Sequence, residues 1–411
     1  MQWKSYGIMQ KTTIYRKPMG ENLFEEEFTI EALSRMGNPL ERLAALVDFE
    51  MFHPALEEVL VKKDRKTRAG RPQIDVVLMS KVMFLQRHYG LGDHQIQYQT
   101  IGRTSFRRFL GIHTVAEVPD GKTVRACKDR LAEGGAFGRL FDESRTLLDG
   151  KGLSFDEGRI IDATFVEAPK QRDTREEDRQ IKAGNGKGLW NPEDGDSEKE
   201  KKRKMHRKSH KDTDARWTKK RGENHYGYKN HVKADKKAKL IEKCHTTDAS
   251  VHDSNVIKPL MEEKDKGQDL FLDAGYESRE DTVKECGMNP VICEKGHRNS
   301  PLTDGQKRNN RIKSRDRCRV EHIFGFVEGA VNGSLVRGIG MMRVKAANAL
   351  TNPVYNISRY VQTNIYQPQL ITCKGWLCPY VSNRQKQHAN EWIDERYRQP
   401  KPSEERLIPK D

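Results

Sequence analysis

Residues 159–169, RIIDATFVEAP, decide the fold class, because they combine an apolar run with a carboxylate in its middle. The run is typical of a β-strand and ends at Pro169. Asp162 lies between Ile161 and Ala163, where a carboxylate is unexpected. Burying a charged group is unfavourable unless the group is paired or binds a metal ion. The segment therefore predicts a strand whose aspartate has a charged partner or a chemical role.

The chain after this strand alternates between strand-like and helical segments. Further strands are expected over residues 226–235, 240–248, 269–276 and 289–295. Helices are expected over residues 253–265, 278–287, 309–329 and 343–363. The resulting order is strand, strand, strand, helix, strand, helix, strand, helix. That order is typical of an α+β, ribonuclease H-like core, a mixed five-stranded sheet flanked by helices.

Residues 1–150 are predicted to form an all-helical N-terminal domain. Residues 74–89 place apolar side chains at three-to-four spacing, and Gly90 and Gly92 end that helix. Short helices joined by glycine turns suit a helix-turn-helix-like DNA reader, with basic side chains for the phosphates at Arg107, Arg108 and Arg125. The alternative is a plain helical packing domain whose arginines are solvated. Residues 155–364 are then the catalytic domain, followed by a C-terminal tail over residues 365–411.

The charge of the chain points to a polyanionic partner. The 411 residues include 75 Lys and Arg against 60 Asp and Glu, a net charge of +15. Such an excess favours DNA or RNA as the partner, although a ribosome-associated or merely basic protein has the same balance. No apolar stretch is long enough to span a bilayer, and residues 1–17 lack the apolar core of a signal peptide. We therefore expect a cytoplasmic protein, associated with the nucleoid through DNA.

Much of the positive charge lies in an insertion over residues 170–224. It contains the run KEKKRKMHRKSHK at 199–211, which has the composition of a disordered or DNA-tracking segment. Such a run is often only a solvated loop, but the high density of positive charge in residues 199–211 favours contact with phosphates. Trp190 and Trp217 lie in the insertion, where they either stack on bases or anchor the segment to the core.

Three acids lie at positions in the predicted fold from which they could act together. Asp162 lies within the first strand, Asp273 ends the fourth, and Glu321 lies on the helix over 309–329. Neighbouring first and fourth strands would bring Asp162 and Asp273 face to face, where a divalent cation offsets their repulsion. Oxygen ligands suit Mg²⁺ or Mn²⁺, and two such ions catalyse in-line phosphoryl transfer. Taken singly, each acid is explained equally by a cap or a salt bridge, such as one between Glu321 and Arg317.

Several segments together resemble a known family. The segments IIDATFVEAP, YGYKNHVKAD, TTDASVHDS, LFLDAGYES and RCRVEHIFGFVEG resemble the signature blocks of DDE transposases of bacterial insertion sequences. They are most similar to the group named after insertion sequence five. Residues 74–97 and the segment VPDGKTVRACKDRL resemble the transposase-associated N-terminal domain of that group. The resemblance covers residues 74–363, apart from the insertion.

The resemblance implies roles for individual residues. The catalytic, metal-binding residues are Asp162, Asp273 and Glu321, and Arg317 matches an arginine four positions before the glutamate. Ser314 stands where the family often has tyrosine, and Glu328 where it often has a lysine that touches the DNA end. The contact with the DNA end would then be made by another basic residue: Arg315, Arg319 or Arg337. Glu328 lies two turns from Glu321 on the same helix face and is the rival third ligand.

The function implied by the resemblance is DNA transposition. Such an enzyme binds the terminal inverted repeats of an insertion sequence, cleaves the strands with metal ions and transfers them to target DNA. Because two DNA ends are held together, a homodimer is expected on DNA. One alternative is a ribonuclease H-like nuclease or resolvase without strand transfer. The other is an inactive derivative that only binds DNA.

Overall fold

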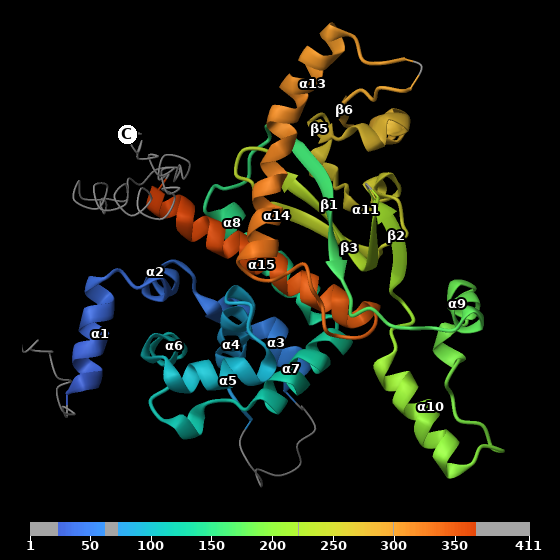
Figure 1. Ribbon diagram of the computed structural model, residues 1–411. Helices are drawn as coiled ribbons and strands as arrows, with labels where there is room; N and C mark the ends of the chain where they lie inside the picture. Colours follow the sequence, from blue (N-terminus) through green and yellow to red (C-terminus); the bar gives the residue numbers. More distant parts are fainter. Residues whose placement is uncertain (1–23, 62–72, 221, 299, 367–411) are drawn as a thin grey trace, which may run out of the picture.

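The structure, a computed structural model, describes residues 24–61, 73–220, 222–298 and 300–366. The first part of the chain is helical (Figure 1). Its helices are α1 (Glu25–Arg35), α2 (Pro39–Leu46), α3 (His53–Leu60), α4 (Val76–His88), α5 (Asp93–Gly102), α6 (Thr104–Leu110), α7 (Gly121–Glu133) and α8 (Ala136–Gly150).

Helix α4 is the central helix of this part, and its ends follow from local chemistry. The Asp75 carboxylate accepts the Leu78 N–H at the first turn, and Gly90, with φ of 62°, allows the chain to leave the last turn. Gly92 is the N-cap residue of α5. The carboxylate of Asp93, the first residue of α5, accepts from Gln86 at 2.7 Å, which ties α5 to α4.

The second part contains a mixed six-stranded sheet with the order β2-β3-β1-β5-β6, in which β4 also pairs with β3. The strands are β1 (Arg159–Glu167), β2 (Arg216–Lys220), β3 (Glu223–Asp235), β4 (Ile241–Asp248), β5 (Asp269–Leu272) and β6 (Asn289–Ile292). The expected mixed sheet flanked by helices is confirmed, but the expected number of five strands is wrong. The additional strand, β2, has the sequence RWTKK, which lacks the apolar alternation of a half-buried strand.

Both faces of the sheet are covered. Ile160 faces a core that includes residues of α8, α14 and α15, whereas Ile161 faces a second core with residues of α11 and α12. This alternation is the ordinary consequence of the strand period of two. The covering helices are α11 (Ile257–Leu260), α12 (Glu280–Glu285), α13 (Asp304–Arg317), α14 (Glu321–Gly329) and α15 (Met341–Tyr366).

Helix α15 joins the two parts of the molecule, because it packs on α4, α7 and α8 as well as on β4. Three buried asparagines spaced four residues apart face the sheet. Asn348 donates to Thr246, Asn352 accepts from Asn230, and Asn356 both donates to and accepts from the backbone of Ile241. The helix continues through Pro353. This row of amides satisfies polar groups that would otherwise be buried without partners.

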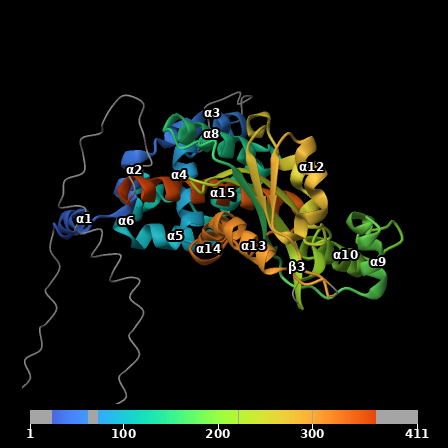
Figure 2. The same ribbon diagram turned by 90° about the horizontal axis from the view of Figure 1, so that it is seen from above.

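The insertion is folded, contrary to the expectation of a disordered segment. It contains α9 (Arg175–Lys182) and α10 (Glu198–His210), each of which begins with a capping box. Trp190 is buried and donates to Glu177 of α9, so it packs within the insertion itself, whereas Trp217 on β2 is exposed. Figure 2 shows α9 and α10 at one end of the molecule and the N-terminal helices at the other, with the sheet between them.

Some element boundaries differ from those predicted. The helix expected over 309–329 is two helices, α13 and α14, separated by a 3-10 turn at Cys318–Val320. The helix expected over 253–265 is α11 between two short 3-10 turns, Asp253–Asn255 and Glu263–Asp265. Of the predicted tail, residues 367–411 lie outside the described residues. None of the described helices is long and apolar enough to cross a membrane.

Candidate active site

Asp162 on β1 and Asp273, which comes directly after β5, lie near one another at the same end of the sheet. Strands β1 and β5 are parallel and pair Arg159 with Leu270 and Ile160 with Phe271, and Asp273 is close enough to Asp162 to raise the pKa of that carboxyl. Neighbouring strands in a sheet lie about 4.8 Å apart. Asp273 directly follows β5, and its carboxylate accepts the Gly275 N–H at 2.9 Å. The two aspartates therefore share one edge of the sheet.

Arg317 links Asp162 to Glu321. Its guanidinium donates to the Asp162 carboxylate at 3.2 Å and to the Glu321 carboxylate at 3.2 Å. Arg317 is the last residue of α13, and Glu321 is the first of α14, so the intervening 3-10 turn places both beside β1. Glu321 is the most open of the three, with 62% of its side chain exposed.

The environment of Asp162 disfavours its ionised form. Burial and the neighbouring charge of Asp273 raise its pKa to about 6, against the lowering effects of the Ala163 N–H, Arg317 and Lys220. A carboxylate that is largely desolvated and repelled by a neighbouring carboxylate gains from any added positive charge. The site therefore fits a divalent cation chemically, with oxygen ligands of the kind that Mg²⁺ and Mn²⁺ prefer.

The three acids do not form a tight cluster in this structure. Among the described residues, the one group of three such side chains whose ligand atoms all lie within 4.8 Å of one another is Glu242, Glu262 and Asp265. Arg317 instead donates to both Asp162 and Glu321. The structure thus brings the predicted residues to one end of the sheet, where an arginine links two of the three.

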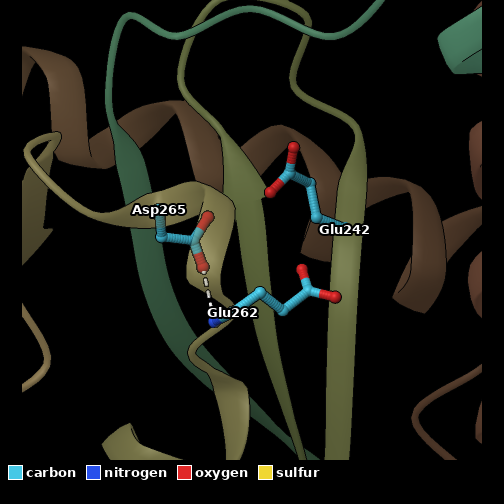
Figure 3. Close-up of side chains that lie close together, drawn as sticks. All are labelled: Glu242, Glu262 and Asp265. Carbon is cyan, nitrogen blue, oxygen red and sulfur yellow. Dashed lines mark hydrogen bonds between the residues drawn. The ribbon is translucent and has the colours of Figure 1, made fainter.

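The cluster of Glu242, Glu262 and Asp265 is part of a buried ion network at the other end of β1 (Figure 3). Asp265 accepts from Arg159 at 3.2 Å and from Lys233 at 2.5 Å, and neither basic side chain is exposed. The buried or half-buried acids Asp235, Glu242, Glu262 and Asp265 are paired with Arg145, Arg159, Lys233 and Lys264, and the more exposed Asp149 and Asp156 are further partners of the two arginines. Basic side chains therefore already supply positive charge to this cluster.

Glu328, the rival third ligand, lies further along β1. Its carboxylate accepts from the Thr164 hydroxyl at 2.8 Å, two residues beyond Asp162 on the same face of the strand. No hydrogen bond or ion pair links it to Asp162 or Arg317 among the described residues. The hydroxyl oxygen of Ser314, which stands where the family often has tyrosine, lies 3.6 Å from the sulfur of Cys293. The geometry therefore joins Glu321, and not Glu328, to the first aspartate.

The predicted DNA-contacting arginines fall into two groups. Several are held within the fold: Arg107 by Glu26 and the Ile101 carbonyl, Arg108 by Glu41, and Arg319 by the Lys236 carbonyl and Asp316. The guanidinium groups of Arg125 and Arg315 are exposed and form no hydrogen bond or ion pair with residues that the structure describes. These two arginines are the better placed for a polyanion.

A further polar group near the acids was missed by the sequence analysis. Tyr276 is almost fully buried, and its hydroxyl has no hydrogen-bond partner among the described residues. Burial, with the charges of Asp253, Asp162 and Asp273, raises its pKa well above the usual value. Lys220 on β2 is also close enough to Asp162 to lower the pKa of that carboxyl. Tyr276 follows Asp273 by three residues, which was a visible signal, whereas nothing in the sequence marked Lys220.

A mixed sheet flanked by helices, with carboxylates at the adjoining ends of parallel strands, is the architecture of the ribonuclease H-like class. Residues 153–357 match the family described as "Transposase DDE domain", and residues 28–130 match that described as "Transposase domain (DUF772)". The chain belongs to the DDE transposases of insertion sequences, enzymes that generally depend on divalent metal ions.

A curated relative supports the assignment. Over 233 residues the chain is 30% identical to the transposase for insertion sequence element IS1106 of Neisseria meningitidis serogroup B. The similar region covers 55% of this chain and 74% of that relative. No solved structure matches the chain.

Proposed function

We propose that the chain binds the terminal inverted repeats of its insertion sequence and catalyses metal-dependent strand cleavage followed by strand transfer. The observation that carries the proposal is that Asp162 on β1 and Asp273, directly after the parallel strand β5, lie near one another while Arg317 joins Asp162 to Glu321. Residues 155–364 are the catalytic domain in this proposal, and residues 1–150 bind DNA.

The proposed metal ligands are Asp162, Asp273 and Glu321, which hold two Mg²⁺ or Mn²⁺ ions. When bound, such ions lower the pKa of an attacking water or 3′-hydroxyl and stabilise the leaving oxygen. Arg317 orients the carboxylates of Asp162 and Glu321, and the Ala163 N–H holds one oxygen of Asp162 at 2.8 Å. Hydrolysis at each end frees a 3′-hydroxyl, and its attack on a target phosphate joins the strands.

The DNA backbone contacts are proposed to include one face of α10. Lys199, Lys202 and Arg203 lie at helical spacing and form no ion pair with the described residues, whereas Lys204 and Arg207 are paired with Asp196 and Glu177. The unpaired face is therefore available to phosphates, with Arg125 and Arg315 as further contacts. Two DNA ends act together in transposition, so a homodimer forms on DNA, in the cytoplasm at the nucleoid.

The test uses duplexes that end in the terminal inverted repeat of the element that encodes the chain. Wild-type protein should cleave an intact duplex in Mg²⁺ and should join a pre-cleaved end to target DNA. Asp162→Asn should lose both reactions yet still bind the duplex, because the metal ligand is removed and the DNA-binding helices are untouched. Full Mg²⁺-dependent cleavage by Asp162→Asn would falsify the assignment of the site.

The same assays separate the alternatives. Cleavage without any joining of pre-cleaved ends would identify a ribonuclease H-like nuclease or resolvase. Binding without cleavage by the wild-type protein would identify an inactive DNA-binding derivative. The acids, the arginine that links two of them and the helical N-terminal part are all present, which favours the active transposase.

A further inference from the structure

The edge of β1 is open next to Asp162. Strand β5 pairs only with Arg159 and Ile160, while β3 pairs with β1 along its whole length on the other side. Backbone contacts on the open side resume at Glu167, which bonds to Ser334 and Val336. Within the described part of the chain, residues 162–166 therefore have no strand partner on this side. A DNA strand bound at Asp162 would have this unpaired stretch of β1 beside it.

Lys220, the last residue of β2, lies over the face of β1 opposite Arg317. Successive residues of a strand point to opposite faces, so Asp162 and Phe165 face different sides of the sheet. Arg317 contacts Asp162, whereas the Lys220 ammonium lies over the Phe165 ring, 5.4 Å from its centroid. The Phe165 ring is itself stacked on His225, with centroids 4.2 Å apart. Lys220 is thus held against Phe165, the residue that follows Asp162 by three positions on β1.

The charge of Lys220 is available to a ligand. Its nearest acid is Asp253, at 3.7 Å, but Asp253 lies closer to the buried Lys229, at 2.9 Å. Lys229 therefore neutralises Asp253. His231, 4.0 Å from Asp253, is buried, and burial lowers its pKa to about 4, so it adds no charge near neutral pH. With 45% of its side chain exposed, the Lys220 ammonium is accessible to a ligand, and it lies within electrostatic range of Asp162.

The opposite face cannot supply the same contact. On the side of α14, Glu328 is bonded to Thr164 and brings a negative charge to the position just beyond Asp162. Arg317 is engaged by both Asp162 and Glu321. A phosphate just beyond the cleavage site therefore meets a carboxylate on one face of β1 and an ammonium on the other.

We propose that Lys220 binds a DNA phosphate adjacent to the one that is cleaved, on the Phe165 face of β1. The inference rests on the proposed function, because it assumes a DNA strand at Asp162. Lys220 lies on β2, which is far in sequence from α14, the helix that carries Glu321.

The test compares Lys220→Gln with Lys219→Gln. Lys219 is its exposed neighbour on β2, has the same charge and points to the opposite face. Binding of an inverted-repeat duplex is measured over a range of salt concentrations. We expect Lys220→Gln to bind about tenfold more weakly and to lower the slope of log K against log salt by about 0.9, the value for one lost phosphate contact. Lys220→Arg should retain most of the affinity.

Uncharged backbone positions in the DNA can identify the phosphate that Lys220 contacts. A methylphosphonate replaces each phosphate next to the cleavage site in turn, and binding of these duplexes by the wild-type protein and by Lys220→Gln is measured. One position should weaken binding by the wild-type protein but not by Lys220→Gln, because the variant has already lost that contact. If every position affects both proteins equally, or if the Lys219 and Lys220 variants behave alike, the inference is wrong.

Failure of the proposed function gives a different result. In that case the wild-type protein fails to bind or cleave the duplex, or Asp162→Asn still cleaves it. If the wild-type protein cleaves, Asp162→Asn does not, and Lys220→Gln equals Lys219→Gln, only the assignment of Lys220 is overturned. Thermal unfolding of each variant checks that the hairpin of β2 and β3 remains folded.

Discussion

The guanidinium of Arg317 donates to the carboxylate of Asp162 at 3.2 Å, across 155 positions of the chain. The same group reaches Glu321, one helical turn further on. Arg317 therefore couples the strand that carries the first aspartate to the helix that carries the glutamate.

Replacing Arg317 should impair cleavage more than DNA binding. Arg317→Ala removes two charge-assisted hydrogen bonds, each worth about 1.5–3 kcal/mol, so the single-turnover cleavage rate should fall about 100-fold. Arg317→Lys should recover only part of the rate, because one ammonium lacks the planar fork that serves two carboxylates. Arg308→Ala is the control: Arg308 is exposed on the same helix and forms no ion pair with the described residues. Equal losses for Arg308→Ala and Arg317→Ala would contradict the role of the bridge.

Glu321 and Glu328 should differ as candidates for the third ligand. Glu321 is joined to Asp162 through Arg317, whereas Glu328 is bonded to Thr164. Glu321→Gln should therefore reduce Mg²⁺-dependent cleavage at least about 1,000-fold, as expected for loss of a group that acts with its partners as a unit. Glu328→Gln should retain most of the activity. The measurement is the cleavage rate as a function of Mg²⁺ concentration, and the reverse order of the two variants would make Glu328 the ligand.

The cluster of Glu242, Glu262 and Asp265 should behave as a structural ion network. Arg159 is completely buried within it, so Arg159→Met leaves unpaired carboxylates and should lower the free energy of unfolding by about 3–5 kcal/mol. Lys264→Met, at the exposed rim, should change it by less than about 1 kcal/mol. Unfolding is followed by urea titration, with and without a chelator. A chelator-dependent loss of stability that disappears in Glu242→Gln would show a metal site instead.

His231 should make the protein sensitive to acid. Burial lowers its pKa from 6.5 to about 4, so its contribution to stability is present above pH 6.5 and is lost as the pH falls towards 4. The expected loss is about 3 kcal/mol, from 1.36 kcal/mol for each unit of pKa. His231→Gln should remove this component from the pH dependence of unfolding. His245→Gln, on the neighbouring strand and less buried, should remove less; equal effects would show that burial of His231 is not the cause.

Parts of this protein were determined by local sequence alone. The apolar runs around Asp162 and before Asp273 predict β1 and β5, because strand formation there depends on burying neighbouring side chains. The helices of the N-terminal part are likewise predicted by the spacing of their apolar residues and by the glycines that end them. The capping boxes of α9 and α10, at Thr174 and Ser197, were also visible and would have predicted order in the insertion. These features depend on residues within a few positions of one another.

Tertiary structure decided the rest. Strand β2 exists because its backbone pairs with β3, and its polar sequence carries no sign of that pairing. The same pairing brings Lys220 to Phe165, and the packing of α13 on the sheet brings Arg317 to Asp162. Hydrogen bonds between distant backbones and contacts between distant side chains depend on the register and packing of whole elements. The sequence therefore indicated the three acids and the pairing of Glu321 with Arg317, whereas the contact of Arg317 with Asp162 and that of Lys220 with Phe165 depend on the folded chain.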